Sequence, residues 1–296
     1  MTDGLTSSKA AYRLTHVLNA VASAHGTPRF PVDVVSLARE SATIFSWQDP
    51  ITAVEAADIK NFEGALYAGD EKQSWLLLYN HRLKSPGRIR FTQAHELGHY
   101  LLHRTQRSSF ECSESDMVDL TQDTLTIEAQ ADDFAGTLLM PLDDFRAQMS
   151  GASDFDALGA CAQRYGTSLT ATTLRWLKHT DESAVLVVHR DGFLLWAYPS
   201  SVAYRRGAFF KTRANTIAVP SASIAADTSI ESERIGIEVP ARTWFPHAPQ
   251  DLTIKEMKIC ADQFDYVMTL LVLPRAYSVW KPRAEFESST PAVNRF

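Results

Sequence analysis

The sequence predicts an α+β fold, in which helices and short strands occur together up to about residue 180 and strands dominate after it. Apolar residues recur at the spacing of an α-helix along 86–103 and 127–141. Short apolar runs bounded by turn residues, typical of strands, become frequent after residue 181. With 296 residues, of which 45% are hydrophobic, the chain can bury more than one core, so we expect more than one domain.

The helix expected at 86–103 begins at a capping signal. Ser85 followed by Pro86 is a typical pair of N-cap and first-turn residues. The apolar residues that follow form one stripe, at Ile89, Ala94, Leu97, Gly98, Leu101 and Leu102. One face of this helix is therefore expected to pack against the protein, while the other face is left to polar side chains.

That polar face carries His95, Glu96 and His99 in the order His-Glu-x-x-His. Because an α-helix has about 3.6 residues per turn, both histidines project from the same face and can converge on one Zn²⁺. Glu96 would then lie beside the open position of the metal, where a proton acceptor is needed. The alternative is an amphipathic helix with solvated histidines, and only a third ligand can decide between the two.

A third ligand is available on the helix expected at 127–141, which Pro141 ends. Glu128 and Asp132 are one turn apart on it. This arrangement resembles that of gluzincins, in which the Glu binds zinc and the Asp receives the N–H of the first histidine, here His95. The alternative is a pair of ordinary solvated charges, because other acidic residues lie nearby in the sequence: Glu111, Glu114, Asp116, Asp119, Asp123 and Asp133.

Together the two segments resemble the ImmA/IrrE-type metallopeptidases. The family pattern is close to RFTxAHELGHxLLH followed by ExxAxxFAxxLLMP, and this chain has RFTQAHELGHYLLH from Arg90 and EAQADDFAGTLLMP from Glu128. The runs 62–66 and 74–80 are also similar to the strand pair that precedes the active-site helix in that family. The resemblance covers residues 10–180 in outline and is specific over the two motif helices.

The resemblance implies a zincin-like core and a site-specific endopeptidase that cleaves a helix-turn-helix transcriptional repressor, and thereby controls a stress or mobile-element response. The residues themselves support metal-assisted hydrolysis, with His95, His99 and Glu128 as ligands and Glu96 as the general base. Mn²⁺ or another divalent ion could replace Zn²⁺, because imidazole and carboxylate ligands accept several metals. The alternative is a regulatory or DNA-binding protein that uses the HExxH fold only as a scaffold.

Further residues near the motif are candidates for stabilising an oxyanion, lining the cleft or binding a peptide. Tyr100, Tyr67, Tyr79 and His81 have the chemistry of an oxyanion donor, although packing or surface exposure is the simpler interpretation of each. His103 is expected to line the cleft or to cap the helix end, where an imidazolium would favour the helix dipole. The segment 74–80 is either an edge strand, to which an extended peptide could be added, or a plain core strand.

Residues 153–178 are typical of two short helices around Gly166, which resembles a helix-turn-helix. Contact with DNA would use the exposed side of the second helix, formed by Thr170, Thr172, Thr173, Arg175 and Lys178. The net charge of −6 argues against a general nucleic-acid partner, because phosphate binding needs a basic face. The alternative is that these helices only pack against the catalytic domain.

We expect four regions: a zinc metallopeptidase domain at 1–150, a helix-turn-helix-like segment at 151–180, an α+β accessory domain at 181–280 and a flexible tail at 281–296. In the accessory domain we expect a hairpin that turns at Asp191-Gly192, a short helix at 251–265, and strands near 215–219, 235–239 and 266–273. By analogy with family members that carry a sensor-like domain, this region would bind a regulator or the substrate.

Cysteine usage and hydropathy predict a cytoplasmic protein without membrane contact. The cysteines are odd in number and widely spaced, at Cys112, Cys161 and Cys260, which favours a reducing compartment and excludes a paired-cysteine metal site. No apolar run approaches the roughly 18 residues of a membrane span, and the first residues lack the apolar stretch of a signal peptide.

Overall fold

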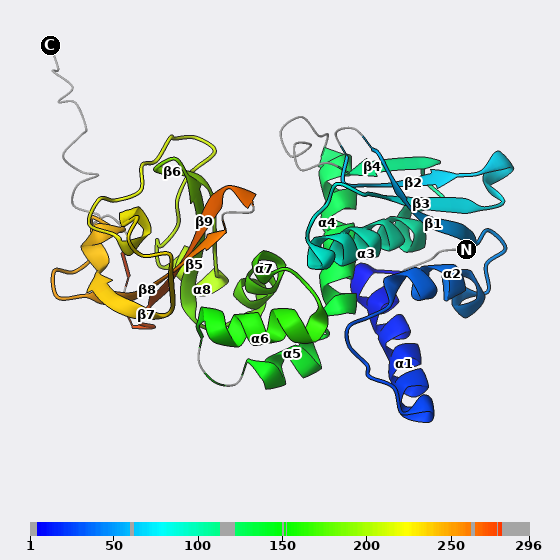
Figure 1. Ribbon diagram of the computed structural model, residues 1–296, viewed down its shortest axis with the longest axis horizontal. Coiled ribbons are helices and arrows are strands. Elements are labelled where there is room, and N and C mark those ends of the chain that lie inside the picture. Colours follow the sequence, from blue (N-terminus) through cyan, green and yellow to red (C-terminus); the bar gives the residue numbers. More distant parts are fainter. Residues whose placement is uncertain are drawn as a thin grey trace, which may run out of the picture. The chain divides into compact units, whose positions relative to one another are not determined.

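The computed structural model describes residues 5–59, 62–112, 122–149, 151, 153–261, 264–276 and 278–279. It has a mixed α+β structure with two sheets, as expected from the sequence (Figure 1). The chain divides into two compact units, one formed by 1–151 and 159–172 and the other by 152–158 and 173–296. The tail expected at 281–296 and the acidic residues Glu114, Asp116 and Asp119 lie outside the described residues.

The first unit contains a four-stranded sheet with the order β1-β3-β2-β4. Its strands are β1 (Ile51–Ala57), β2 (Gly64–Ala68), β3 (Trp75–Asn80) and β4 (Ser109–Cys112). β1 and β3 run parallel, whereas β2 is antiparallel to both β3 and β4. Because β3 pairs on both sides, its interpretation as an edge strand is wrong. The alternative of a core strand is confirmed by Trp75 and Leu77, which are 1% and 0% exposed.

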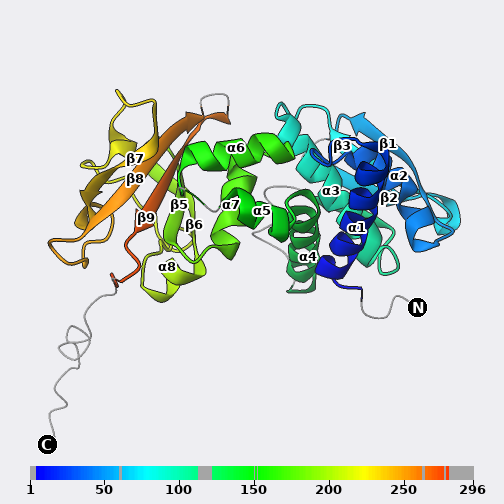
Figure 2. The ribbon, with the colours of Figure 1, turned by 90° about the horizontal axis from the view of Figure 1, so that it is seen from below.

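Five helices complete most of this unit: α1 (Ser7–His25), α2 (Val34–Phe45), α3 (Pro86–His103), α4 (Gln122–Leu139) and α5 (Leu142–Gln148). α3 begins where the sequence predicts, because the Ser85 side chain accepts a hydrogen bond from the Arg88 amide and Pro86 occupies the first turn. α3 contacts β2 and β3, and α4 lies beside α3 and α1 (Figure 2).

Two shorter helices, α6 (Phe155–Tyr165) and α7 (Leu169–His179), match the pair expected around Gly166, and both are divided between the two units. The prediction of an exposed face on α7 is wrong for three of its residues. Thr172 and Thr173 are 0% exposed and Arg175 is 5% exposed, so these side chains are not available to a nucleic acid. The apolar spacing of α7 predicted the helix but not how widely it is buried.

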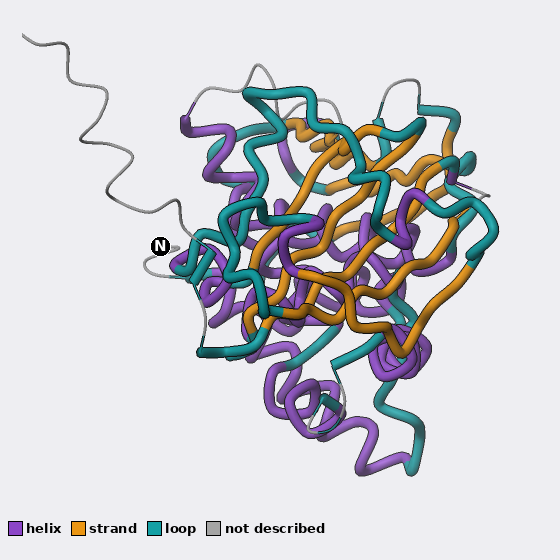
Figure 3. Tube along the Cα trace, turned by 90° about the vertical axis from the view of Figure 1, so that its left-hand side faces the viewer, coloured by secondary structure: helices purple, strands orange, loops and turns teal. Residues whose placement is uncertain are grey.

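The second unit contains a five-stranded antiparallel sheet with the order β6-β5-β9-β8-β7. Strands are drawn in orange in Figure 3. Its elements are β5 (Ser183–Arg190), β6 (Phe193–Pro199), α8 (Ser201–Arg205), β7 (Ser232–Pro240), β8 (Thr253–Ala261) and β9 (Tyr266–Leu273). The predicted hairpin is confirmed, since β5 and β6 are joined by Asp191 and Gly192, which have the positive φ angles of 51° and 78°. The strands expected near 235–239 and 266–273 lie in β7 and β9.

Two predictions for this unit are wrong. The strand expected near 215–219 is reduced to a single bridge between Phe193 and Ala218. The helix expected at 251–265 is instead the strand β8, which pairs with β7 and β9. Its Glu256 and Lys258 are 0% and 2% exposed, so charged residues occupy positions on the buried face and conceal the alternation of a strand.

A polar cluster around Asp49 joins the start of the first sheet to α3. The Asp49 carboxylate accepts hydrogen bonds from the Trp75 indole at 3.2 Å and from the Arg104 guanidinium at 3.0 Å. Tyr100 donates to the Asp49 carbonyl at 2.8 Å, and the Arg104 guanidinium lies 3.2 Å from the centre of the Trp47 ring. This cluster fixes α3 against the sheet.

Among the described residues, no helix is long and apolar enough to span a membrane.

Asp49→Ala should lower the free energy of unfolding by about 2 kcal/mol, because it leaves the buried Arg104 guanidinium without its carboxylate. Asp58→Ala is the matched control, since Asp58 pairs with Arg82 on the surface, where the loss should stay below about 1 kcal/mol. Urea denaturation followed by tryptophan fluorescence measures both. Equal losses in the two variants would contradict a structural role for the Asp49 cluster.

Candidate metal centre

Three side chains from α3 and α4 converge at one point in the first unit. The ligand atoms offered by His95, His99 and Glu128 all lie within 4.8 Å of one another. The two Nε2 atoms of His95 and His99 are 3.0 Å apart, and the Glu128 carboxylate oxygens lie 3.0 Å from His95 Nε2 and 3.4 Å from His99 Nε2. The sequence pointed to the histidines from their spacing and to Glu128 from the resemblance to gluzincins, and the fold brings the three together.

The donor set fits a tetrahedral divalent ion. Zinc bonds of about 2.0–2.1 Å place neighbouring ligand atoms about 3.3 Å apart at the corners of a tetrahedron. The distance of 3.0 Å between the two Nε2 atoms is close to that edge length, as are 3.0 Å from His95 Nε2 to Glu128 Oε2 and 3.4 Å from His99 Nε2 to Glu128 Oε1. His95, His99 and Glu128 could therefore hold one ion and leave a fourth position open.

Gly98 allows the two helices to come this close. A Cβ atom at Gly98 would lie 3.0 Å from Phe134 Cδ1 and 3.2 Å from the Cα atom of Ala131. Phe134 and Ala131 are 0% exposed, so the facing side of α4 has little room to move. A larger residue at Gly98 would push α4 away and carry Glu128 out of reach of the histidines.

Burial and hydrogen bonding set the protonation states that a metal needs. Burial lowers the pKa of His99 to about 4, an effect that outweighs the opposing hydrogen bond that His99 donates to Glu128. Burial alone would raise the pKa of Glu128, but hydrogen bonds with His95 and His99 outweigh it and hold this pKa well below its usual range. At neutral pH, therefore, His99 is neutral and Glu128 is ionised, as metal ligands must be.

Asp132 lies where the sequence predicts an orienting carboxylate. His95 Nδ1 is 2.9 Å from Asp132 Oδ1, which is the distance of an N–H donated to a carboxylate. With its proton on Nδ1, His95 would present the lone pair of Nε2 to a bound ion.

Glu96 is 0% exposed on α3, and Gly64 of β2 lies directly against it. A Cβ atom at Gly64 would be 2.5 Å from Glu96 Oε1 and 2.6 Å from Thr92 Cγ2. Any side chain at Gly64 would therefore displace the carboxylate. Gly64 was expected only to be part of a strand. A glycine inside a strand often marks a close approach of this kind, and this signal could have identified it.

The side chains considered as oxyanion donors are occupied or peripheral. Tyr100 is 0% exposed and donates to the Asp49 carbonyl, so its role is packing. Tyr67 donates to Glu111 at 2.9 Å, and burial together with that carboxylate raises the pKa of Tyr67 to about 12. Tyr79 is only half-buried on β3, and His81 is exposed.

His103 differs from its expectation. It is 1% exposed, its Nδ1 lies 3.1 Å from His99 Nδ1, and its Nε2 lies 2.9 Å from Gln130 Oε1. Burial also lowers the pKa of His103, which disfavours an imidazolium at the helix end. Helix spacing placed His103 below His99, but only the fold shows that Gln130 faces it.

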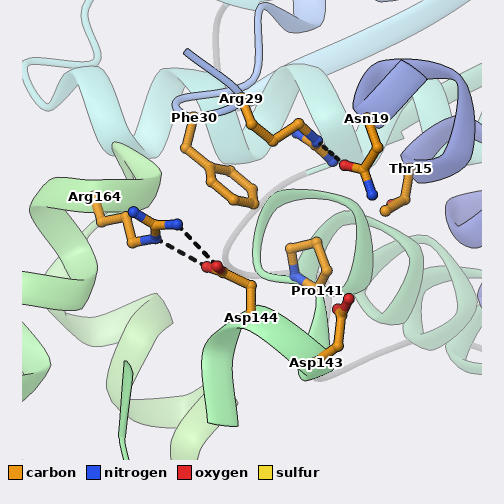
Figure 4. A pocket seen from close by; sticks show the side chains of 8 residues that line it. All are labelled: Thr15, Asn19, Arg29, Phe30, Pro141, Asp143, Asp144 and Arg164. Carbon is orange, nitrogen blue, oxygen red and sulfur yellow. Dashed lines mark hydrogen bonds and ion pairs between the residues drawn. The ribbon is translucent and has the colours of Figure 1, made fainter. Parts of the chain in front are cut away.

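A separate pocket lies in the same unit and contains none of the predicted site residues (Figure 4). Its walls are formed by Thr15, Asn19, Arg29, Phe30, Pro141, Asp143, Asp144 and Arg164. Arg164 donates to both carboxylate oxygens of Asp144, at 2.9 and 2.8 Å, and Arg29 donates to Asn19 at 2.7 Å. Polar groups in this pocket therefore largely bind one another.

Comparison with known families agrees with this geometry. Residues 49–177 match the family model for the IrrE N-terminal-like domain of the M78 peptidases. Over this segment the chain is similar to an M78 peptidase domain. The resemblance to the ImmA/IrrE family is thereby confirmed over this segment, which contains the HExxH helix, Glu128 and Asp132. Because M78 peptidases are metallopeptidases, the family implies a divalent metal, for which His95, His99 and Glu128 form a candidate site.

Among solved structures, a Mycobacterium tuberculosis transcriptional regulator is similar to this chain. The two share 13% sequence identity, and the match covers 88% of this chain and 76% of that chain with a TM-score of 0.49. The comparison with curated proteins gives no match.

Asp132→Ala should weaken zinc affinity by roughly 10–100-fold while the fold is retained, because His95 loses the group that orients it. Competition with a chromogenic chelator measures the affinity. Asp133→Ala is the matched control, since the neighbouring Asp133 accepts a hydrogen bond from the Ser7 hydroxyl at 2.6 Å. Unchanged zinc affinity in Asp132→Ala would show that Asp132 does not orient His95 and is only a surface charge.

Proposed function

We propose that this protein is a zinc-dependent, site-specific endopeptidase of the ImmA/IrrE type. The observation that carries the proposal is the convergence of His95, His99 and Glu128 within 4.8 Å, with the buried Glu96 on the same helix turn, inside an M78 peptidase domain. A zincin-like core, with the HExxH helix packed on a short sheet, is part of this proposal and is supported by the contacts of α3 with β2 and β3.

Each residue has a distinct role in the proposed reaction. When bound, the ion would lower the pKa of a water molecule and polarise the scissile carbonyl. His95, His99 and Glu128 hold the site, and Asp132 keeps His95 in the required tautomer. Glu96 takes a proton from the attacking water and passes it to the leaving amine. The contact of Gly64 with the Glu96 carboxylate limits its movement and excludes water from that side.

The sheet beside the site supports a peptide substrate. Among the described strands, β4 pairs only with β2 and forms one end of the sheet. Phe110 of β4 stacks on His99, with ring centres 4.6 Å apart and planes inclined by 16°. An extended peptide added to the outer edge of β4 would therefore run close to the ligands. In this proposal β4, and not β3, is the edge strand to which an extended peptide is added.

The substrate and setting are proposed from the family resemblance. We propose a helix-turn-helix transcriptional repressor as the substrate, cleaved in the cytoplasm to control a stress or mobile-element response. Zinc is proposed as the ion, with Mn²⁺ or another divalent ion as the alternative. A regulatory or DNA-binding protein that uses this fold as a scaffold is the second candidate function, and it makes the opposite prediction for Glu96 below.

We also propose a division of the chain by function. The metallopeptidase domain occupies 1–150, a helical segment 151–180 follows it, and an accessory domain at 181–280 recognises a regulator or the substrate before the tail at 281–296. The division of α6 and α7 between both compact units supports treating them as a connecting segment.

Glu96→Gln should keep zinc and fold but cut the repressor about 10²–10⁴-fold more slowly, because the amide has the size of the carboxylate without its basicity. The zinc-loaded protein is incubated with purified helix-turn-helix repressors from the same cell, and new N-termini are identified by mass spectrometry. Glu55→Gln, at an exposed position on β1, is the matched control and should cleave like the wild type.

Cleavage by Glu96→Gln at the wild-type rate, with zinc in place, would refute the hydrolytic mechanism. A wild-type protein that binds zinc and the repressor but cuts nothing would instead favour the scaffold function.

A further inference from the structure

His99 is oriented by a different set of groups from His95. His95 Nδ1 meets the exposed carboxylate of Asp132, whereas His99 Nδ1 lies 3.1 Å from His103 Nδ1. The other ring nitrogen of His103 is 2.9 Å from the side-chain oxygen of Gln130. These contacts form a chain from Gln130 on α4, through His103, to His99 on α3.

The direction of this chain follows from its outer end. The Gln130 side-chain oxygen faces His103 Nε2, and in this orientation of the amide it accepts the hydrogen of that nitrogen. A neutral His103 then has a lone pair on Nδ1, which accepts the N–H of His99 Nδ1. With an ion bound, His99 would consequently keep its lone pair on Nε2, the atom that lies 3.0 Å from His95 Nε2 and 3.4 Å from Glu128 Oε1.

Burial explains why neutral groups serve this position. His99 and His103 are 0% and 1% exposed, whereas the Asp132 side chain is 61% exposed. A carboxylate placed beside His99 would lose its hydration, which is unfavourable for a charged group. An imidazole followed by an amide avoids that cost and still fixes the tautomer. The ring of Phe110 lies beside both imidazoles, with its centre 4.6 Å from the centre of the His99 ring and 6.1 Å from that of the His103 ring.

We propose that His103 and Gln130 are positioning residues that orient His99 through a neutral hydrogen-bond relay, so that its Nε2 atom faces the metal. The inference rests on the proposed metal site. It implies that α4 supplies a ligand, Glu128, together with the outermost orienting group for each of the two histidines.

Four variants test the relay by zinc affinity, measured by competition with a chromogenic chelator. His103→Leu removes the acceptor and should weaken zinc binding by about 10–100-fold. His103→Asn places an acceptor oxygen near the position of Nδ1 and should restore most of that loss. Gln130→Ala, at an exposed position, should weaken binding in the same direction by a smaller factor, whereas the exposed Gln163→Ala on α6 is the matched control.

Nitrogen NMR of labelled histidines provides a readout that packing alone would not change. With zinc bound, the relay predicts a proton on Nδ1 of His99 and on Nε2 of His103. In zinc-loaded His103→Leu, the Nδ1 proton of His99 loses its acceptor, so the Nδ1 resonance of His99 should shift. A proton on His103 Nδ1 in the wild type would reverse the direction of the chain and overturn the proposal.

Two affinity results would also overturn it. One is wild-type zinc affinity in a His103→Leu protein that unfolds at the wild-type temperature. The other is an equal loss in His103→Leu and His103→Asn, which would indicate packing. If His103→Leu does not fold, Gln130→Ala provides the test. Unchanged zinc affinity and unchanged histidine tautomers in that variant would refute the relay. A wild type that binds zinc but cleaves no peptide would refute the proposed function and leave these measurements of the relay intact.

Discussion

The close packing of α3 on α4 is the constraint on which the rest of the site depends. Gly98 lets the α4 backbone approach so closely that even a Cβ atom would lie 3.0 Å from Phe134. At this separation Glu128 reaches both histidines, and Gln130 and Asp132 reach the groups behind them. A shift of α4 by the width of one methyl group would therefore disturb the ligand and both orienting contacts together.

Burial differs across the site, and the chemistry of the orienting groups follows it. His95 is 8% exposed and is paired with the solvent-exposed Asp132, whose charge remains hydrated. His99 is 0% exposed and is followed by His103 and Gln130, which carry no charge when neutral. Two histidines one turn apart thus reach the same presentation of Nε2 by different means, because the cost of burying a charge rises with depth.

Features that depend on local periodicity could be predicted from the sequence, whereas those that depend on tertiary contacts could not. Helix spacing named His95 and His99, and the resemblance to gluzincins named Glu128 and Asp132, which are also one turn apart on their own helix. The contact of Gly64 with Glu96 and the relay through Gln130 join separate elements. The spacing of residues within one helix or strand therefore cannot predict them. In β8, buried charges hid the strand pattern, and the pairing of β3 on both sides followed from the order of the sheet.

The most direct test of the account is the metal content of the purified protein and of one ligand variant. Elemental analysis of the wild type after dialysis against zinc should give one zinc ion per chain, and X-ray absorption should show imidazole nitrogens and a carboxylate oxygen around it. His99→Ala should lose most of that zinc. Equal zinc in the wild type and in His99→Ala would contradict the assignment of His95, His99 and Glu128 as the metal site.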